Sequence, residues 1–153
     1  RRVFSIHTDS QGRVIAANGR IGIYDGHQMR ELPTPSGVHT GALAVDGQDR
    51  VWVGNHEDIG YFVETADGWV FTSVKPELPA GVTLPEIIWS VHCVGETVFF
   101  VGSHQVLVRT EAGIRLVELP GLRRLFASVQ GQYCYVWQRG QDRTQLWRLD
   151  VEG

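Results

Sequence analysis

The feature that most constrains the fold of this chain is an internal repeat that recurs four times. Segments 5–17, 42–54, 90–102 and 127–137 align so that a turn is followed each time by an apolar stretch. In the first two segments Asp9 falls over Asp46, and Arg13 falls over Arg50. The apolar anchors of the four segments are Val14, Val51, Phe99 and Tyr135, spaced 37, 48 and 36 residues apart. Repeats of about 40–45 residues with four strands each are typical of propeller blades.

A second marker supports the same register. The tripeptide Glu-Leu-Pro occurs at residues 31–33, 77–79 and 118–120, each time near the end of a unit. Proline lacks a backbone N–H, so it is tolerated best where an outer strand ends. The three copies therefore predict the outer edges of three successive sheets.

Alternating apolar residues predict the strands within each unit. The expected inner strands are 4–8, 41–45, 89–93 and 125–129, and the second strands are 14–17, 51–54, 99–102 and 133–137. The expected third strands are 21–24, 60–63, 106–109 and 145–149, and the fourth strands are 29–32, 69–74 and 114–119. Leu122, Leu125, Phe126 and Val129 have helical spacing, but the repeat register favours a strand there. The second strands are almost continuously apolar, which indicates sheets packed between two others.

The fold class predicted is all-β, a partial β-propeller of about three and a half four-stranded antiparallel blades. The expected units are residues 1–37, 38–86, 87–121 and 122–153, within one domain that is a fragment of a larger protein. The fourth unit ends at Gly153, on the turn where its outer strand is expected to begin. An unclosed propeller exposes strand edges and an apolar blade face. We therefore expect self-association through the open blade faces or edges.

Composition excludes several classes of partner. Eighteen glycines and six prolines are spread along 153 residues, which suits short strands joined by turns. The net charge is −3 and no basic cluster exists, so we expect no nucleic-acid binding by this segment. No stretch is long and apolar enough to span a bilayer, so no membrane contact is expected either. Cys93 and Cys134 fall in predicted strands and are interpreted as buried thiols; a disulfide would need neighbouring strands.

The loops after the second strands and the connections between blades open on the same face of a propeller. Such radially arranged loops converge on the central depression, where ligand sites gather. The candidate ligand-binding residues on this face are Asn55, His56, Glu57, Trp89, His104 and Arg139. Their mixture of groups suits sugar hydroxyls, and an exposed Trp89 would stack on a sugar ring. No HxH or HExxH spacing occurs, so we expect no metal and no cofactor, and no catalytic residue is assigned.

Residues 44–55, which contain Asp46, Gly47 and the run Val-Trp-Val-Gly-Asn, resemble the two-component regulator propeller repeat. The first unit is similar through Asp9, Gly12 and the segment Gly-Ile-Tyr-Asp at 22–25. Streptogramin-lyase-like propellers would give similar fragments. The resemblance implies an extracytoplasmic sensor domain, periplasmic or extracellular, that often recognises carbohydrates. The parent protein then carries an output domain such as a histidine kinase.

The resemblance leads to one expected function and two alternatives. We expect a non-catalytic, ligand-sensing propeller segment of a bacterial signalling protein, whose ligand is a small molecule or a glycan. The first alternative is a propeller enzyme, a lyase or a glycan-processing enzyme, with His104 or His56 as base. The second alternative is a scaffold for protein–protein interaction.

Overall fold

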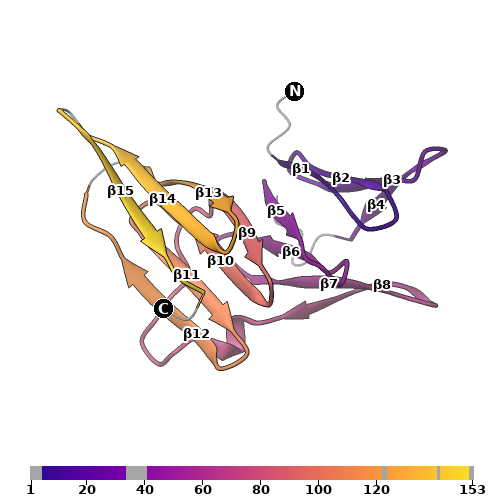
Figure 1. The fold of residues 1–153 in the computed structure, drawn as a ribbon. Coiled ribbons are helices and arrows are strands. Elements are labelled where there is room, and N and C mark those ends of the chain that lie inside the picture. The colour runs from indigo at the N-terminus through magenta and orange to yellow at the C-terminus, as the bar shows by residue number, and fades with distance from the viewer. Residues whose placement is uncertain (1–4, 34–40, 122–123, 141, 152–153) are drawn as a thin grey trace.

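The computed structural model describes residues 5–33, 41–121, 124–140 and 142–151, which form fifteen strands in four antiparallel sheets (Figure 1). The first sheet contains β1 (Ser5–Thr8), β2 (Val14–Ala17), β3 (Ile21–Tyr24) and β4 (Met29–Leu32). The second contains β5 (Ala42–Val45), β6 (Val51–Gly54), β7 (Ile59–Thr65) and β8 (Gly68–Ser73). The third contains β9 (Ser90–Val94), β10 (Thr97–Val101), β11 (Gln105–Thr110) and β12 (Gly113–Glu118). The fourth contains β13 (Phe126–Gln130), β14 (Tyr133–Arg139) and β15 (Thr144–Leu149).

The predicted fold class is confirmed, because each sheet is a simple antiparallel meander in sequence order. The four inner strands follow one another side by side, with contacts from β1 to β5, from β5 to β9 and from β9 to β13. The sheets therefore fan out from a common axis as propeller blades do (Figure 1). The segment with helical spacing is the strand β13, as the repeat register predicted, although Leu122 lies outside the described residues. The boundary expected at residue 37 also lies outside them.

The Glu-Leu-Pro copies do not all have the same structure. Two of them end outer strands, since Leu32 closes β4 and Glu118 closes β12. The middle copy instead begins within a short 3₁₀ turn, η2 (Lys75–Glu77), which is inserted after β8. This turn begins the long connection that leads over one end of the blades to the third sheet.

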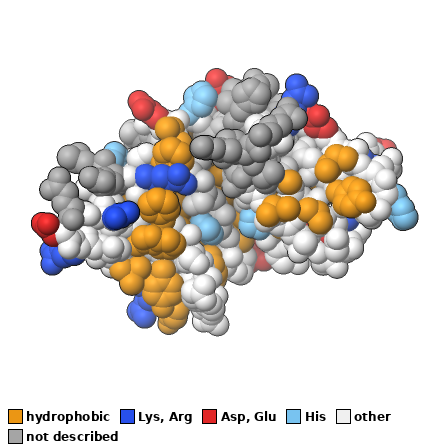
Figure 2. All heavy atoms as spheres, turned by 90° about the horizontal axis from the view of Figure 1, so that it is seen from above, with side chains coloured by type: hydrophobic (Ala, Val, Ile, Leu, Met, Phe, Trp, Pro, Cys, Tyr) orange, Lys and Arg blue, Asp and Glu red, His pale blue; other side chains and the backbone are white. Residues whose placement is uncertain are grey.

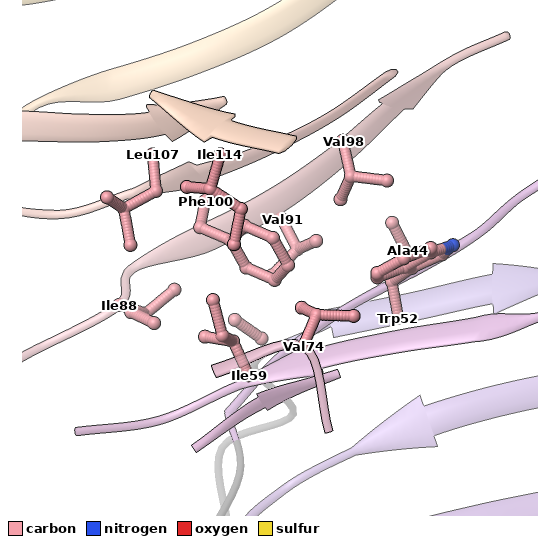
Figure 3. Packing of buried hydrophobic residues seen from close by; sticks show 11 residues of the cluster. Ala44, Trp52, Ile59, Val74, Ile88, Val91, Val98, Phe100, Leu107 and Ile114 are labelled. Carbon is pink, nitrogen blue, oxygen red and sulfur yellow. The ribbon is translucent and has the colours of Figure 1, made fainter. Parts of the chain in front are cut away.

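In the part of the chain that the structure describes, the core consists of three layers, each between two consecutive sheets. The middle layer joins the second and third sheets, where Trp52 and Ile59 meet Val98, Phe100 and their neighbours (Figure 3). Trp52 and Phe100 are fully buried, and their rings meet edge to face with centroids 6.2 Å apart. Equivalent layers lie between the first and second sheets and between the third and fourth. The near-continuous apolar runs of the second strands are thus explained by burial on both faces.

Aspartate and arginine of the repeat hold the turns that join the inner strands to the second strands. The buried Asp46 carboxylate accepts hydrogen bonds from the backbone N–H groups of Gln48 and Arg50 and from the Arg50 side chain. Arg50 then reaches the next blade and pairs with Glu96 at 3.0 Å. Asp9 and Arg13 repeat this arrangement in the first blade, where Arg13 pairs with Glu64 of the second. The aspartate and arginine of the repeat therefore link each of these two blades to the next one through an ion pair.

The two cysteines lie in different layers of the core. Cys93 packs against the layer between the second and third sheets, whereas Cys134 lies within the layer between the third and fourth. Both thiols are free and are separated by the third sheet, so the interpretation as unpaired, largely buried thiols is confirmed. Within the described residues, no helix has the length and apolar character needed to cross a membrane.

Candidate functional site

A cavity of about 440 Å³ lies on the face where the second-to-third-strand loops and the blade connections meet. Its wall combines the turn after β6 with the end of the long connection that precedes β9 and with the connection that precedes β13. The lining residues are Gly19, Gly41, Gly54, Asn55, His56, Glu86, Ile87, Ile88, Trp89 and Arg124. Segments from all four repeat units therefore converge on one cavity, on the face that the sequence predicted.

The turn after β6 fixes the position of His56. The side-chain oxygen of Asn55 accepts hydrogen bonds from the backbone N–H groups of Glu57 at 2.8 Å and Asp58 at 2.9 Å. The Asn55 N–H donates to the Asp58 carbonyl oxygen, which closes the turn. His56 is consequently held at the tip, with 56% of its side chain exposed, and its Nε2 lies 3.7 Å from a carboxylate oxygen of Glu57.

Close packing at the floor of the cavity explains why β6 ends in a glycine, Gly54. A Cβ atom at Gly54 would come within 2.9 Å of Ile88 Cδ1 and 3.2 Å of a ring carbon of Phe100. The lack of a side chain at Gly54 therefore lets Ile88, in the connection between β8 and β9, pack directly against the end of β6. Ile88 is almost fully buried by this contact, while Ile87 beside it is 46% exposed.

A guanidinium group forms the opposite side of the cavity. The Arg124 Cζ atom lies 4.0 Å from the ring centroid of Trp89 and 4.9 Å from that of Phe126. Contact with two aromatic rings restrains a side chain that is otherwise exposed. The Trp89 indole in turn donates a hydrogen bond to the Ser103 hydroxyl at 3.0 Å. Trp89 is thus partly buried and fixed at its edge, and it serves as a support for Arg124 rather than as the exposed stacking platform that we expected.

The structure brings only part of the predicted set together. Asn55, His56 and Trp89 line the cavity, with Glu57 beside His56. His104 lines a separate cavity of about 210 Å³. Glu86 and Ile87 border both cavities, so the connection between β8 and β9 separates the two histidines. Arg139, at the end of β14, is exposed and lines neither of them.

Sequence reasoning missed Arg124, Glu86 and the two isoleucines. These residues could have been found from their position in the connections between blades, because these connections run over the same face as the candidate loops. Which residues of a long connection point inward depends on packing such as that of Ile88 on Gly54, and periodicity does not encode it.

A second cavity, of about 450 Å³, lies at the opposite end of the first two blades. Arg13 and Glu64 line it and pair with each other at 2.7 Å, and Arg13 also pairs with Asp9. Its principal charged groups are thus already engaged in joining the two blades. We therefore take the cavity with His56 and Arg124 as the candidate functional site.

His7 and His92, which lie on inner strands, are less exposed to solvent than His56. Burial and the nearby His7 lower the pKa of His92 to about 4. Burial also lowers the pKa of His7, against the opposing effect of a hydrogen bond with the backbone of Leu43. Both imidazoles are therefore neutral at pH 7. Among the described residues, no group of three or more potential metal ligands is found.

The comparisons with known proteins support the fold. No family model and no curated protein matches the sequence, so the two-component regulator assignment has no support from a family match. A solved streptogramin B lyase matches 99% of this chain with 15% identity and a TM-score of 0.61. Virginiamycin B lyase from Staphylococcus aureus matches 95% of it, with 15% identity and a TM-score of 0.58. The chain spans about 55% of the length of each of these proteins.

The prediction that this chain is not an enzyme is corrected by these comparisons, because both solved propellers are lyases. The sequence contains no contiguous catalytic motif, but the site of a propeller is assembled from loops of several blades, so the lack of such a motif was no argument against an enzyme. The comparisons agree with the alternative of a propeller enzyme and do not support sensing or carbohydrate binding. The extracytoplasmic location remains a prediction.

Proposed function

We propose that the cavity with His56 and Arg124 is part of the active site of a propeller lyase, which cleaves its substrate by elimination. The observation that carries this proposal is the meeting of an exposed imidazole and a restrained guanidinium in one cavity. An elimination needs a base that removes a proton from carbon and a cation that stabilises the resulting negative charge. The cavity supplies one group of each kind.

In the proposed reaction, neutral His56 accepts a proton from a carbon atom next to a carbonyl group. The electrons of the broken C–H bond form an enolate, whose oxygen is stabilised by Arg124. Collapse of the enolate forms a carbon–carbon double bond and expels the leaving group from the adjacent carbon with its bonding electrons. The leaving group takes a proton from solvent, and the His56 imidazolium releases one to solvent, which restores the neutral base. Glu57 stabilises the imidazolium that forms on His56.

The fold gives this proposal its first substrates to test. The two solved propellers are named as lyases of streptogramin B and of virginiamycin B. We extend this class of substrate to the present chain because its cavity lies where loops of the four units converge. The mouth of the cavity has both apolar and polar groups, since Ile87 is exposed beside His56 and Glu86.

The proposal is tested by incubating the chain with virginiamycin B and following the substrate and products by mass spectrometry. Elimination leaves the summed mass of the products equal to that of the substrate, whereas hydrolysis adds a water molecule. We expect His56→Gln to lower kcat by about 10²–10⁴-fold, which is the usual contribution of a general base. Arg124→Gln is expected to lower kcat by about 10²–10³-fold, as loss of an anion-stabilising donor does.

His27→Gln provides the matched control, because His27 is also exposed but lies on the turn between β3 and β4, at the other end of the blades. Its kcat should equal that of the wild type. Loss of activity in His104→Gln, with activity retained in His56→Gln, would move the base to the neighbouring cavity and contradict the assignment. Absence of both binding and cleavage would contradict the proposed substrate class.

A further inference from the structure

The connection between β8 and β9 runs between two cavities on the face where the loops meet. We call the cavity of about 440 Å³ with His56 the larger cavity, and the cavity of about 210 Å³ with His104 the smaller cavity. Glu86 and Ile87 line both cavities, and both side chains are exposed. These two residues therefore form a ridge that the two cavities share as a wall.

The ridge is held at both ends by close contacts with glycines at the ends of second strands. Before the ridge, Pro85 is buried, and its Cβ atom would lie only 3.0 Å from a Cβ atom added at Gly102, directly after β10. After the ridge, Ile88 packs against Gly54 at the end of β6. The ridge is thus fixed on two successive blades, and it keeps the two cavities apart.

Ser103, His104 and Gln105 supply polar side chains to the smaller cavity. The Ser103 hydroxyl accepts the N–H of the Trp89 indole at 3.0 Å, and its own O–H can still donate. Among the described residues, neither the His104 imidazole nor the Gln105 amide has a hydrogen-bond partner. A ligand in this cavity therefore meets a hydroxyl donor, two ring nitrogens and an amide that both donates and accepts.

The histidines of the two cavities do not belong to one cluster. On the side of the molecule that Figure 2 shows, histidine side chains lie apart from one another. His56 and His104 likewise line different cavities, with the ridge between them. His104 is therefore considered by itself, as a hydrogen-bonding group of the smaller cavity.

The groups of the smaller cavity favour a neutral ligand that has both a donor and an acceptor. The described residues that line it include no lysine or arginine, which an anionic ligand would need as a partner. The Gln105 side chain has a donor and an acceptor side by side, so another amide can pair with it through two hydrogen bonds. Pro85 and Ile87 provide apolar walls for the carbon atoms next to such a group. An amide therefore fits the smaller cavity best.

We propose that the smaller cavity binds an amide group of the substrate whose reacting carbon lies beside His56 in the larger cavity. The bound substrate then lies across the ridge. This inference rests on the elimination proposed for His56, and it names the kind of group that the substrate presents beyond the reacting carbon. The amide is unchanged by the elimination, so its hydrogen bonds are equally strong in the bound substrate and in the transition state. Their loss raises KM and leaves kcat close to that of the wild type.

Steady-state kinetics with virginiamycin B test this proposal. Gln105→Met keeps the length of the side chain and removes its hydrogen-bonding groups, whereas His104→Phe keeps a planar ring and removes its nitrogens. Each variant should raise KM by about 3–10-fold with little change in kcat, as expected for the loss of a hydrogen bond to a neutral group. Neither residue is buried, so thermal unfolding of both variants should resemble that of the wild type.

Gln28→Met and His27→Phe are the matched controls. Gln28 and His27 are exposed on the turn between β3 and β4, so the same chemical changes are made away from both cavities and should leave KM and kcat at their wild-type values. Gln105→Glu tests the charge of the bound group. It should also raise KM, because a carboxylate cannot donate a hydrogen bond. A lower KM in Gln105→Glu would show that the group is cationic and would overturn the proposed amide.

Calorimetric titration of virginiamycin B into His56→Gln, with and without Gln105→Met, separates this proposal from the proposed function. The added Gln105→Met should weaken binding by about the same 3–10-fold. Cleavage by Gln105→Met with unchanged KM, together with unchanged Kd, would overturn the smaller cavity as a substrate site and leave the elimination standing. Binding that weakens with Gln105→Met, in a protein whose wild type does not cleave the compound, would contradict the elimination and support the site. Absence of binding to the wild type would overturn both.

Discussion

The hydrogen bonds of Asp46 allow a quantitative prediction about what holds the repeat together. Its carboxylate has only 2% of its surface exposed and accepts four hydrogen bonds. Two come from backbone N–H groups of the turn and one from Arg50 Nε at 2.6 Å. The fourth comes from the indole Nε1 of Trp52 at 2.9 Å, and Trp52 is fully buried. Asp46→Ala therefore leaves a buried donor that water cannot reach.

The magnitude follows from these contacts. An unsatisfied buried donor costs about 1–3 kcal/mol, and removal of one partner of a buried ion pair costs about 3–5 kcal/mol. Arg50 is 19% exposed and regains some hydration, so we expect Asp46→Ala to lower the free energy of unfolding by about 3–5 kcal/mol in total. Asp9→Ala is the matched comparison and should cost about 1–2 kcal/mol less, because Asp9 has no bond from a tryptophan.

Urea unfolding of the wild type, Asp46→Ala, Trp52→Phe and the double variant, at one protein concentration, measures the coupling between the two side chains. Trp52→Phe removes the N–H donor and keeps an aromatic ring in the layer between the sheets. We expect a coupling energy of about 1–2 kcal/mol, so that Asp46→Ala costs less in the Trp52→Phe background. A coupling energy below about 0.5 kcal/mol would refute the claim that the indole depends on this carboxylate.

Three further predictions concern buried groups and backbone approach. Burial lowers the pKa of His92 from 6.5 to about 4, so between these pH values the unfolded chain binds more protons than the folded chain. The free energy of unfolding should therefore fall by up to about 3 kcal/mol as the pH drops from 6.5 to 4. His92→Leu should remove this pH dependence in urea titrations. Burial raises the pKa of Cys93 and Cys134 to about 12, so at pH 8 both thiols should react with an alkylating reagent only at the rate of unfolding. Fast labelling of the native chain would argue against this burial. A Cβ at Gly60 would lie 2.2 Å from a backbone oxygen of β8, so Gly60→Ala should lower the unfolding free energy by about 2–4 kcal/mol, whereas Gly47→Ala, in open space, should change it by less than about 0.5 kcal/mol.

The sequence was sufficient to predict the sheets because each blade repeats the same local rules. Turn residues such as Asp46 and Gly131 fall between apolar runs, and both occupy the turns that were expected. The repeat register also outweighed the helical spacing around Phe126. A strand there pairs with β14 and buries Leu125, whereas an isolated helical turn would leave β14 without its inner neighbour.

The candidate site was less accessible to sequence reasoning. Asn55 and His56 were identified from the position of their loop, but the role of Asn55 in fixing the turn became visible only from its hydrogen bonds. Arg124 reaches the cavity because Trp89 and Phe126, from different blades, hold it there. Such contacts between distant segments have no periodic signal. The same reason explains why the expectation of a chain without enzymatic activity was wrong.

The central proposal for this protein is that the cavity with His56 and Arg124 performs elimination. Cleavage of virginiamycin B in water enriched in oxygen-18 tests it most directly. We predict products that contain no heavy oxygen and a new carbon–carbon double bond, formed at a rate that depends on His56. Incorporation of one heavy oxygen atom into the products, or turnover that is unchanged in His56→Gln, would contradict the claim.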